Sequence, residues 1–246
     1  MLKISPLNPP APVTTSPKMP PIDAYEALFE SLELIGEHSN AYCNFHEKQK
    51  AAFLEMPASI KGHHCFPGGY AVHLCEVVTN LVRLVRADIY PAAKRVNLGE
   101  AIIAGYIHDL DKLLMRYVRD TDKPTDPQRK KALMEGIQMA PDETKASLSK
   151  KIDAAVTGKP LPNDTELPRH VFNPAMPAVD DSAAVMFLCN QHGLPGITWD
   201  IVHAVSLHHG GYSSLARTSP YVEASPLALL LHAADQISAG IQQGDV

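Results

Sequence analysis

A histidine and an aspartate stand side by side in the middle of an apolar stretch, at His108 and Asp109 within Glu100 to Leu114. Around them apolar residues recur every three or four positions, which predicts a helical face turned toward a core: Ile103, Ile107, Leu110 and Leu114. A carboxylate is costly to bury beside such a face unless it meets a partner or a metal ion. Lys112 lies one helical turn further on. The stretch predicts either a structural hydrogen-bonded pair or part of a metal site.

Other histidines and one aspartate occupy comparable positions elsewhere. His73 lies one turn into a predicted helix that begins at the Pro67-Gly68-Gly69 turn, and His208-His209 end a helix that Thr198 caps. Asp235 is the single acidic residue of an apolar helix that starts at Pro226. Taken singly, each has an ordinary interpretation, such as a histidine that interacts favourably with a helix C-terminus. Further histidines precede the glycine turn or lie in a loop: His63, His64 and His170.

The composition is that of an ordinary globular protein of 246 residues, with 45% hydrophobic residues and a formal charge of −5. This charge argues against a surface that binds duplex nucleic acid stably. No apolar run is long enough to cross a bilayer, and the first residues lack the pattern of a signal peptide. We therefore expect a cytoplasmic protein that does not interact with membranes.

Composition also divides the chain. Residues 1–22 hold seven prolines and almost nothing to bury, which predicts a disordered arm. Residues 23–246 form the predicted domain, whose first helix begins at Asp23 with a capping box to Glu26 and stops at Gly36; a second covers Tyr42 to Glu55. Residues 117–169 are richer in charge and proline, and they predict a helical insertion or lid.

The order of these residues resembles that of a known superfamily. His, His-Asp, His-His and Asp follow one another in the segments PGGYAVH, IHDLDK, HHGG and LLLHAADQISA. The pattern is similar to that of HD-domain proteins, in particular the branch with bacterial 3'-5' exoribonucleases and the HD domains attached to conjugative relaxase-like proteins. The resemblance extends over residues 60 to 240.

The resemblance implies an all-α HD-domain helical bundle with a metal site. One divalent ion (Mn, Fe, Mg, Ni, Co or Zn) would be held by His73, His108, Asp109 and Asp235. If a second ion binds, Asp109 would bridge the two, and His170, His208 and His209 would complete the other side. Asp109 and Lys112 would be catalytic, with Lys112 near a phosphate oxygen. We expect substrate contacts from five residues: His64, Lys112, Arg116, Arg129 and Lys130.

The implied function is a metal-dependent phosphohydrolase acting on a nucleotide or a short phosphodiester. Because no OB-fold is expected, a nucleotide or short oligonucleotide is favoured over a polymer. Two departures from the family pattern bear on the site: Asp111 replaces a usual glycine, and His170 lies in an unusual context. The alternatives are a di-iron oxygenase of a small molecule, favoured by complete ligation of a second metal, and a nucleotide-sensing module without turnover. No pattern predicts the oligomeric state.

Overall fold

The computed structural model describes residues 19–60, 63–87, 91–119, 170–176, 179–210, 213 and 224–241. These residues are mostly helical and include one small two-stranded sheet, so the predicted all-α fold is confirmed. Most of the predicted N-terminal arm, and all of the predicted insertion after residue 119, lie outside the described residues. The division of the chain into arm, domain and insertion stays a prediction. No helix in the described part is long and apolar enough to span a membrane.

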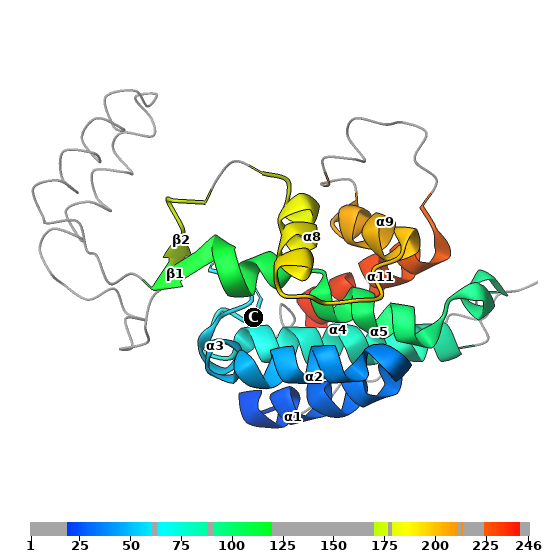
Figure 1. Ribbon diagram of the computed structural model, residues 1–246, viewed down its shortest axis with the longest axis horizontal. Coiled ribbons are helices and arrows are strands. Elements are labelled where there is room, and N and C mark those ends of the chain that lie inside the picture. The colour runs from blue at the N-terminus through cyan, green and yellow to red at the C-terminus, as the bar shows by residue number, and fades with distance from the viewer. Residues whose placement is uncertain are drawn as a thin grey trace, which may run out of the picture.

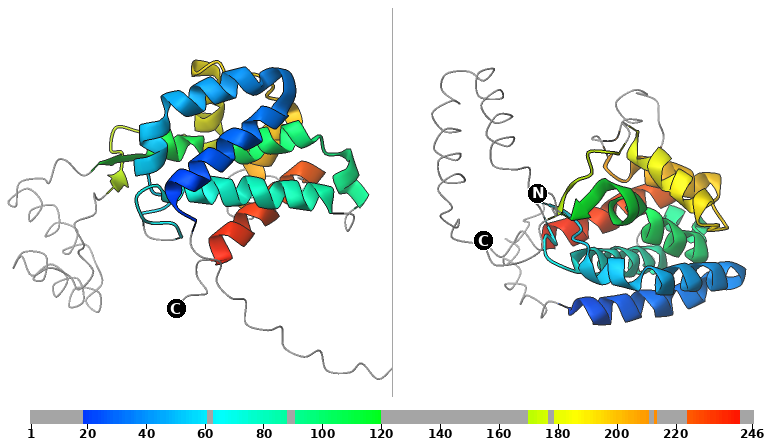
Figure 2. Two further views of the ribbon diagram at one scale, coloured as in Figure 1. Left: turned by 90° about the horizontal axis from the view of Figure 1, so that it is seen from below. Right: turned by 60° about the vertical axis from the view of Figure 1, so that its left-hand side comes forward.

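Helix α4 (Gly69–Arg86) lies at the centre of the bundle and packs against α1 (Pro21–Leu32), α5 (Leu98–Ile107) and α11 (Pro226–Ile241). Helix α9 (Trp199–Leu207) packs on α5 and α11. Figures 1 and 2 place α1 and α2 (Ser39–Lys48) on one side of α4 and α5, and α8 (Asp181–Gln191) and α9 on the other. The remaining helical segments are α3 (Lys50–Glu55), 3-10 turns at Glu33–His38 and Pro91–Arg95, and a π-helical turn at Lys112–Arg116.

The predicted start of the first helix is wrong by two residues. Helix α1 begins at Pro21, and no side chain caps it, so the capping box from Asp23 does not form. Proline suits the first helical position because the N–H that it lacks would have no partner there. The predicted break at Gly36 is confirmed by its positive φ of 70°. The helix predicted from Tyr42 to Glu55 is divided into α2 and α3, on either side of Gln49.

The glycine turn before α4 is packed too closely for any side chain. A Cβ at Gly69 would lie 2.0 Å from the carbonyl oxygen of His64, and one at Gly68 would lie 2.5 Å from Pro21 Cβ. Gly68 also has a φ of +75°, which side chains rarely adopt. The two glycines therefore let the turn that carries His63 and His64 close onto the start of α4.

Replacing Gly69 by alanine is expected to displace this turn and to destabilise the fold by about 1–3 kcal/mol, the usual cost of overpacking. Gly240→Ala is the matched control, because a Cβ at Gly240 meets nothing within 4 Å and alanine favours a helix. Urea unfolding of both variants checks the prediction. Equal midpoints for Gly69→Ala and the parent would show that the turn adjusts without cost.

The first residues of the predicted insertion pair with the residues that directly follow it. Strands β1 (Tyr117–Arg119) and β2 (His170–Phe172) are antiparallel, with Val118 opposite Val171. Figure 1 shows this sheet at the edge of the bundle, beyond the π-helical turn. The pairing places both ends of the intervening segment close to the residues that follow the His-Asp pair. Strands of three residues are too short for a period-two pattern to predict.

His46 on α2 is fully buried in an aromatic cluster. Its Nε2–H donates to the Tyr25 carbonyl at 3.0 Å, and its Nδ1 accepts from the Tyr106 hydroxyl at 3.0 Å. A neutral imidazole satisfies both contacts. Burial lowers the pKa of His46 to about 4; the bond to the Tyr25 carbonyl opposes this shift and the charge of Lys50 adds to it. His46 is therefore a neutral core residue at physiological pH.

This pKa predicts acid sensitivity. The unfolded chain protonates His46 near pH 6.5 and the folded chain only near pH 4, so its contribution is complete above pH 6.5 and falls as the pH drops toward 4. The full loss is about 3 kcal/mol. Burial and the charges of His73 and Lys112 also lower the pKa of His63 to about 4, so His63 acts in the same direction.

Urea unfolding of metal-free parent and His46→Gln across this pH range isolates the contribution of His46. The parent should lose more stability than the variant between pH 6.5 and 4. Parallel curves would show that His46 does not cause the acid sensitivity.

Candidate metal centre

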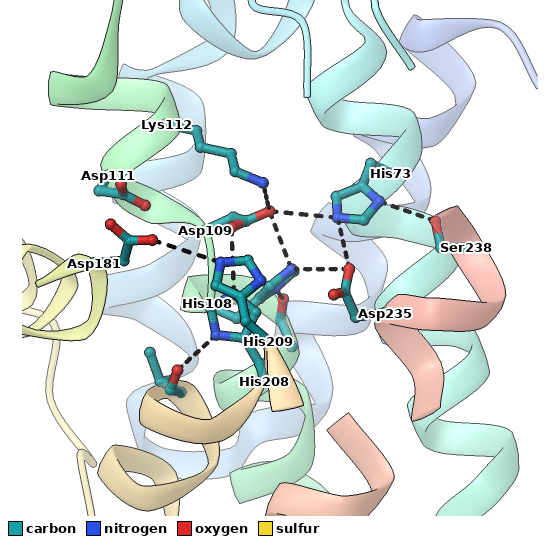
Figure 3. Close-up of polar contacts among 12 residues, drawn as sticks. His73, His108, Asp109, Asp111, Lys112, Asp181, His208, His209, Asp235 and Ser238 are labelled. Atoms are coloured by element: carbon teal, nitrogen blue, oxygen red, sulfur yellow. Dashed lines mark hydrogen bonds and ion pairs between the residues drawn. The ribbon is translucent and has the colours of Figure 1, made fainter. Parts of the chain in front are cut away.

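Four helices bring the predicted ligands to one buried place, shown in Figure 3. His73 lies on α4, the pair His108-Asp109 directly follows α5, His208 directly follows α9, and Asp235 lies on α11. Each of these side chains is buried, with at most 6% of the residue exposed. Residues separated by more than a hundred positions in the sequence thus meet because their helices pack around α4 and α5.

Two of the histidines sit at the ends of their helices for the same reason. His108 Nδ1 lies 2.7 Å from the Gly105 carbonyl, and His208 Nδ1 lies 2.6 Å from the Val205 carbonyl. The last carbonyls of a helix lack intrahelical partners, and here an imidazole N–H supplies one. The helix predicted across Glu100 to Leu114 is therefore interrupted at the His-Asp pair. The π-helical turn that follows it is a form often found at functional sites.

These bonds fix the proton on one nitrogen of each ring. His73 Nδ1 likewise lies 3.0 Å from Ser238 Oγ. With Nδ1–H donating in all three rings, the Nε2 atoms of His73, His108 and His208 carry lone pairs. All three are buried and have no hydrogen-bond partner among the described residues. Buried polar atoms are rarely left in this state, whereas metal-ligating histidines regularly donate their second N–H in this way.

Two carboxylates face these nitrogens. Asp109 Oδ2 lies 3.4 Å from His73 Nε2 and 3.3 Å from His108 Nε2, and its Oδ1 lies 3.6 Å from His208 Nε2. Asp235 Oδ1 lies 3.3 Å from His73 Nε2 and 3.9 Å from His108 Nε2. Two ligands that each lie roughly 2.1 Å from one ion are about 3.0–3.4 Å apart, so most of these separations suit a shared cation.

Two of the groups whose potential ligand atoms lie within 4.8 Å of one another contain a carboxylate: His73, His108 and Asp235, and Asp109, His208 and His209. Asp109 directs one oxygen toward each group, which is the arrangement of a bridging carboxylate. Imidazole nitrogen with carboxylate oxygen suits Mn, Fe, Co, Ni or Zn, whereas Mg prefers oxygen alone. The residues therefore fit a divalent transition metal.

A buried cation accompanies the central carboxylate. Lys112 Nζ lies 2.6 Å from Asp109 Oδ2. Burial alone would raise the pKa of Asp109, but the charge of Lys112 outweighs it and holds that pKa well below its usual range. Burial would lower the pKa of Lys112, and the charge of Asp109 outweighs it and raises that pKa. Both groups are thus ionised at neutral pH.

The two remaining predicted ligands differ. His209 belongs to the second group, and its Nε2 also lies 3.6 Å from Asp181 Oδ2. His170 lies on β2 with its Nε2 3.6 Å from Glu55 Oε1, and it joins neither group formed by the described residues. The role of His209 as a ligand stays a prediction with geometric support. The role of His170 as a ligand stays a prediction without geometric support.

Arg116 does not have the surroundings of a phosphate-binding residue. Its Nε lies 2.6 Å from Asp111 Oδ2, and its Nη2 contacts Asp181 Oδ1. Burial and the charge of Asp109 raise the pKa of Asp111 to about 6, against the effect of Arg116, so Asp111 is ionised at neutral pH. The two carboxylates neutralise Arg116, and the geometry contradicts the predicted substrate contact.

The other residues predicted to contact substrate are His64, Lys112, Arg129 and Lys130. His64 is 2% exposed, and both its ring nitrogens are hydrogen-bonded, to His63 and to Glu76. The prediction that His64 binds substrate therefore stays one without geometric support. Lys112 lies at the centre, as described above. Arg129 and Lys130 lie outside the described residues.

Three residues linked to the predicted ligands went unnoticed in the sequence: Ser238 and Asp181 contact them directly, and Glu76 contacts Ser238. Ser238 follows Asp235 by three positions and Glu76 follows His73 by three, so each shares a helix face with a ligand. That spacing could have revealed both. Asp181 gave no such signal, because its link to His209 depends on how α8 packs beside α9.

A helical bundle with buried histidine and aspartate groups is consistent with an HD-type site. Part of the chain is similar to known proteins: 67 residues, 27% of its length, are 37% identical to the 3'-5' exoribonuclease YhaM of Bacillus subtilis (strain 168). YhaM of Bacillus velezensis matches at the same identity and length. The match spans 20% of each relative, so the similarity is distant and partial. No family model and no solved structure matches the chain.

Proposed function

We propose that the protein is an HD-type, metal-dependent phosphohydrolase that acts on a nucleotide or a short oligonucleotide. One observation carries the proposal: the buried Nε2 atoms of His73, His108 and His208 all face the Asp109 carboxylate, and the first two also lie near Asp235. Without a proton or a metal ion these three nitrogens have no partner among the described residues, because the nearby Lys112 ammonium contacts Asp109 instead. Divalent ions at the two ligand groups would give each nitrogen a partner.

The proposed ligands and Lys112 have different roles in this reaction. His73, His108 and Asp235 hold one divalent ion, with Asp109 between it and a second position at His208 and His209. A bound ion supplies Lewis acidity toward a phosphoryl oxygen and an activated water. Asp109 aligns both positions, and the Lys112 ammonium neutralises negative charge that develops on the phosphate.

The substrate class is supported by two independent points. Lys112 is a buried cation beside the proposed ligands, and such a charge suits a phosphate rather than a neutral substrate. The partial similarity to exoribonucleases favours a phosphodiester between nucleotides. These points leave the base and the chain length open.

Metal analysis of protein purified without chelator tests the proposal, followed by phosphate release from a nucleotide panel and cleavage of short oligonucleotides. We expect about one to two transition-metal ions per chain and hydrolysis that a chelator abolishes. Two retained irons with dioxygen uptake and no hydrolysis would favour the oxygenase. Nucleotide binding without turnover at any metal loading would favour the sensing module.

A further inference from the structure

Behind His73, on the side of its ring opposite the carboxylates, hydrogen bonds link four groups that the proposed chemistry does not use. His73 Nδ1 lies 3.0 Å from Ser238 Oγ, as Figure 3 shows, and Ser238 Oγ lies 2.7 Å from Glu76 Oε2. His64 Nε2 lies 3.1 Å from the same Glu76 oxygen. His63 Nδ1 lies 3.0 Å from His64 Nδ1. These five residues form one continuous chain from the turn before α4 to the metal centre.

The carboxylate in the middle determines where every proton lies. Burial would raise the pKa of Glu76, but hydrogen bonds from His64 and Ser238 lower it, so Glu76 is an ionised acceptor. The Ser238 hydroxyl donates its only hydrogen to Glu76, so its oxygen must accept the hydrogen bond from His73 Nδ1–H. His64 donates through Nε2 to Glu76, and its Nδ1 therefore accepts from His63.

The same assignment excludes a third metal position. Nitrogen atoms of His63, His64 and His73 lie within 4.8 Å of one another, as metal ligands would. Both ring nitrogens of His64 are already hydrogen-bonded, however, which leaves it no lone pair for an ion. The three histidines are parts of a hydrogen-bonded chain.

We propose that Glu76 is the positioning residue of the metal centre: through Ser238 it holds His73 in the tautomer and orientation that ligation requires, and through His64 it fastens the preceding turn to α4. The inference rests on the proposed metal centre. The close approach of Gly69 to the His64 carbonyl holds the turn from its other side. Glu76 is partly exposed and does not reach the ligand atoms itself, so its effect passes through neighbouring residues.

Titration of metal-free protein with Co²⁺ tests this role. Glu76→Gln and Ser238→Ala should each weaken binding between about tenfold and a hundredfold, the usual effect of removing the partner of a ligating histidine. The double variant should bind no more weakly than the worse single variant, because both substitutions break the same chain. Glu30→Gln and Ser31→Ala on α1 are the matched controls, since Glu30 is exposed and Ser31 bonds only within its own helix. Both should bind like the parent.

Two spectroscopic readouts separate positioning from a general structural effect. The visible absorption of bound Co²⁺ should change in Ser238→Ala, and ¹⁵N NMR of the parent loaded with diamagnetic Zn²⁺ should show His73 protonated at Nδ1 and ligated through Nε2. Unchanged affinities, additive losses, an unchanged Co²⁺ spectrum or the opposite tautomer would each overturn the inference while the proposed function stands. Failure of the parent itself to bind Co²⁺ would instead overturn the proposed function.

Discussion

Asp109→Ala is expected to abolish metal retention and to lower hydrolysis by at least about a thousandfold, because the stabilisation of several kcal/mol that a bound ion gives the transition state is lost. Asp109 contacts all three histidines that carry unprotonated Nε2 atoms, and one of its oxygens faces each ligand group. Among the described residues, Asp109 is the carboxylate with an oxygen near the histidines of both groups. Metal content by elemental analysis and hydrolysis of the best substrate are the measurements.

Asp109→Ala could act by removing a metal ligand or by disturbing the packing of the core, and a control variant must distinguish these two effects. Removing Asp109 leaves the buried Lys112 ammonium without its partner, which is itself destabilising. Asp109→Asn combined with Lys112→Met removes both charges at nearly constant volume and should fold while lacking metal. Asp200→Asn, at an exposed position in the first turn of α9, should behave as the parent. Full metal content and activity in Asp109→Ala would show that the His-Asp pair is structural.

Much of the centre could be predicted because its residues lie on or directly after helices with an apolar face, several of them beside a glycine turn. His73 follows a glycine turn, His208 precedes one, and Asp235 is the one charge in an apolar helix. Such positions combine a buried face with access to the end of a helix, where side chains from several elements can converge. The helical bundle itself followed from apolar periodicity and turn residues, which act locally.

Contacts between segments distant in sequence could not be predicted in the same way. From the sequence, Arg116 is predicted to be a free basic residue, but the packing of α8 brings Asp181 into contact with it. His64 is predicted to face a cleft, but its bond to Glu76 and the close packing of Gly69 bury it. The break after α5 depends on a bond from His108 to its own helix. Periodicity carries no information on such bonds, because it reports only which face of a helix is apolar.

Lys112 should matter for turnover and little for metal binding. Its ammonium and the proposed ion share the Asp109 carboxylate, so removing the ammonium takes away a competing cation and no ligand. Lys112→Met keeps the aliphatic stem that packs in the buried site and deletes only the charge. We expect unchanged or tighter Co²⁺ binding and hydrolysis slower by about a hundredfold, the usual cost of one donor to developing negative charge. Lys50→Met, which removes a lysine over the Tyr25 ring at the far side of the bundle, is the matched control.

The division of the effect between binding and turnover decides the role of Lys112. If the lysine merely balances the charge of Asp109, Lys112→Met should disturb metal content and hydrolysis together. If it acts on the phosphate, kcat should fall while metal content is kept, and the loss should be larger for substrates with poor leaving groups, whose transition states place more charge on the phosphate oxygens. Equal kcat in Lys112→Met and the parent would remove Lys112 from the catalytic residues and leave the ion as the sole source of positive charge at the phosphate.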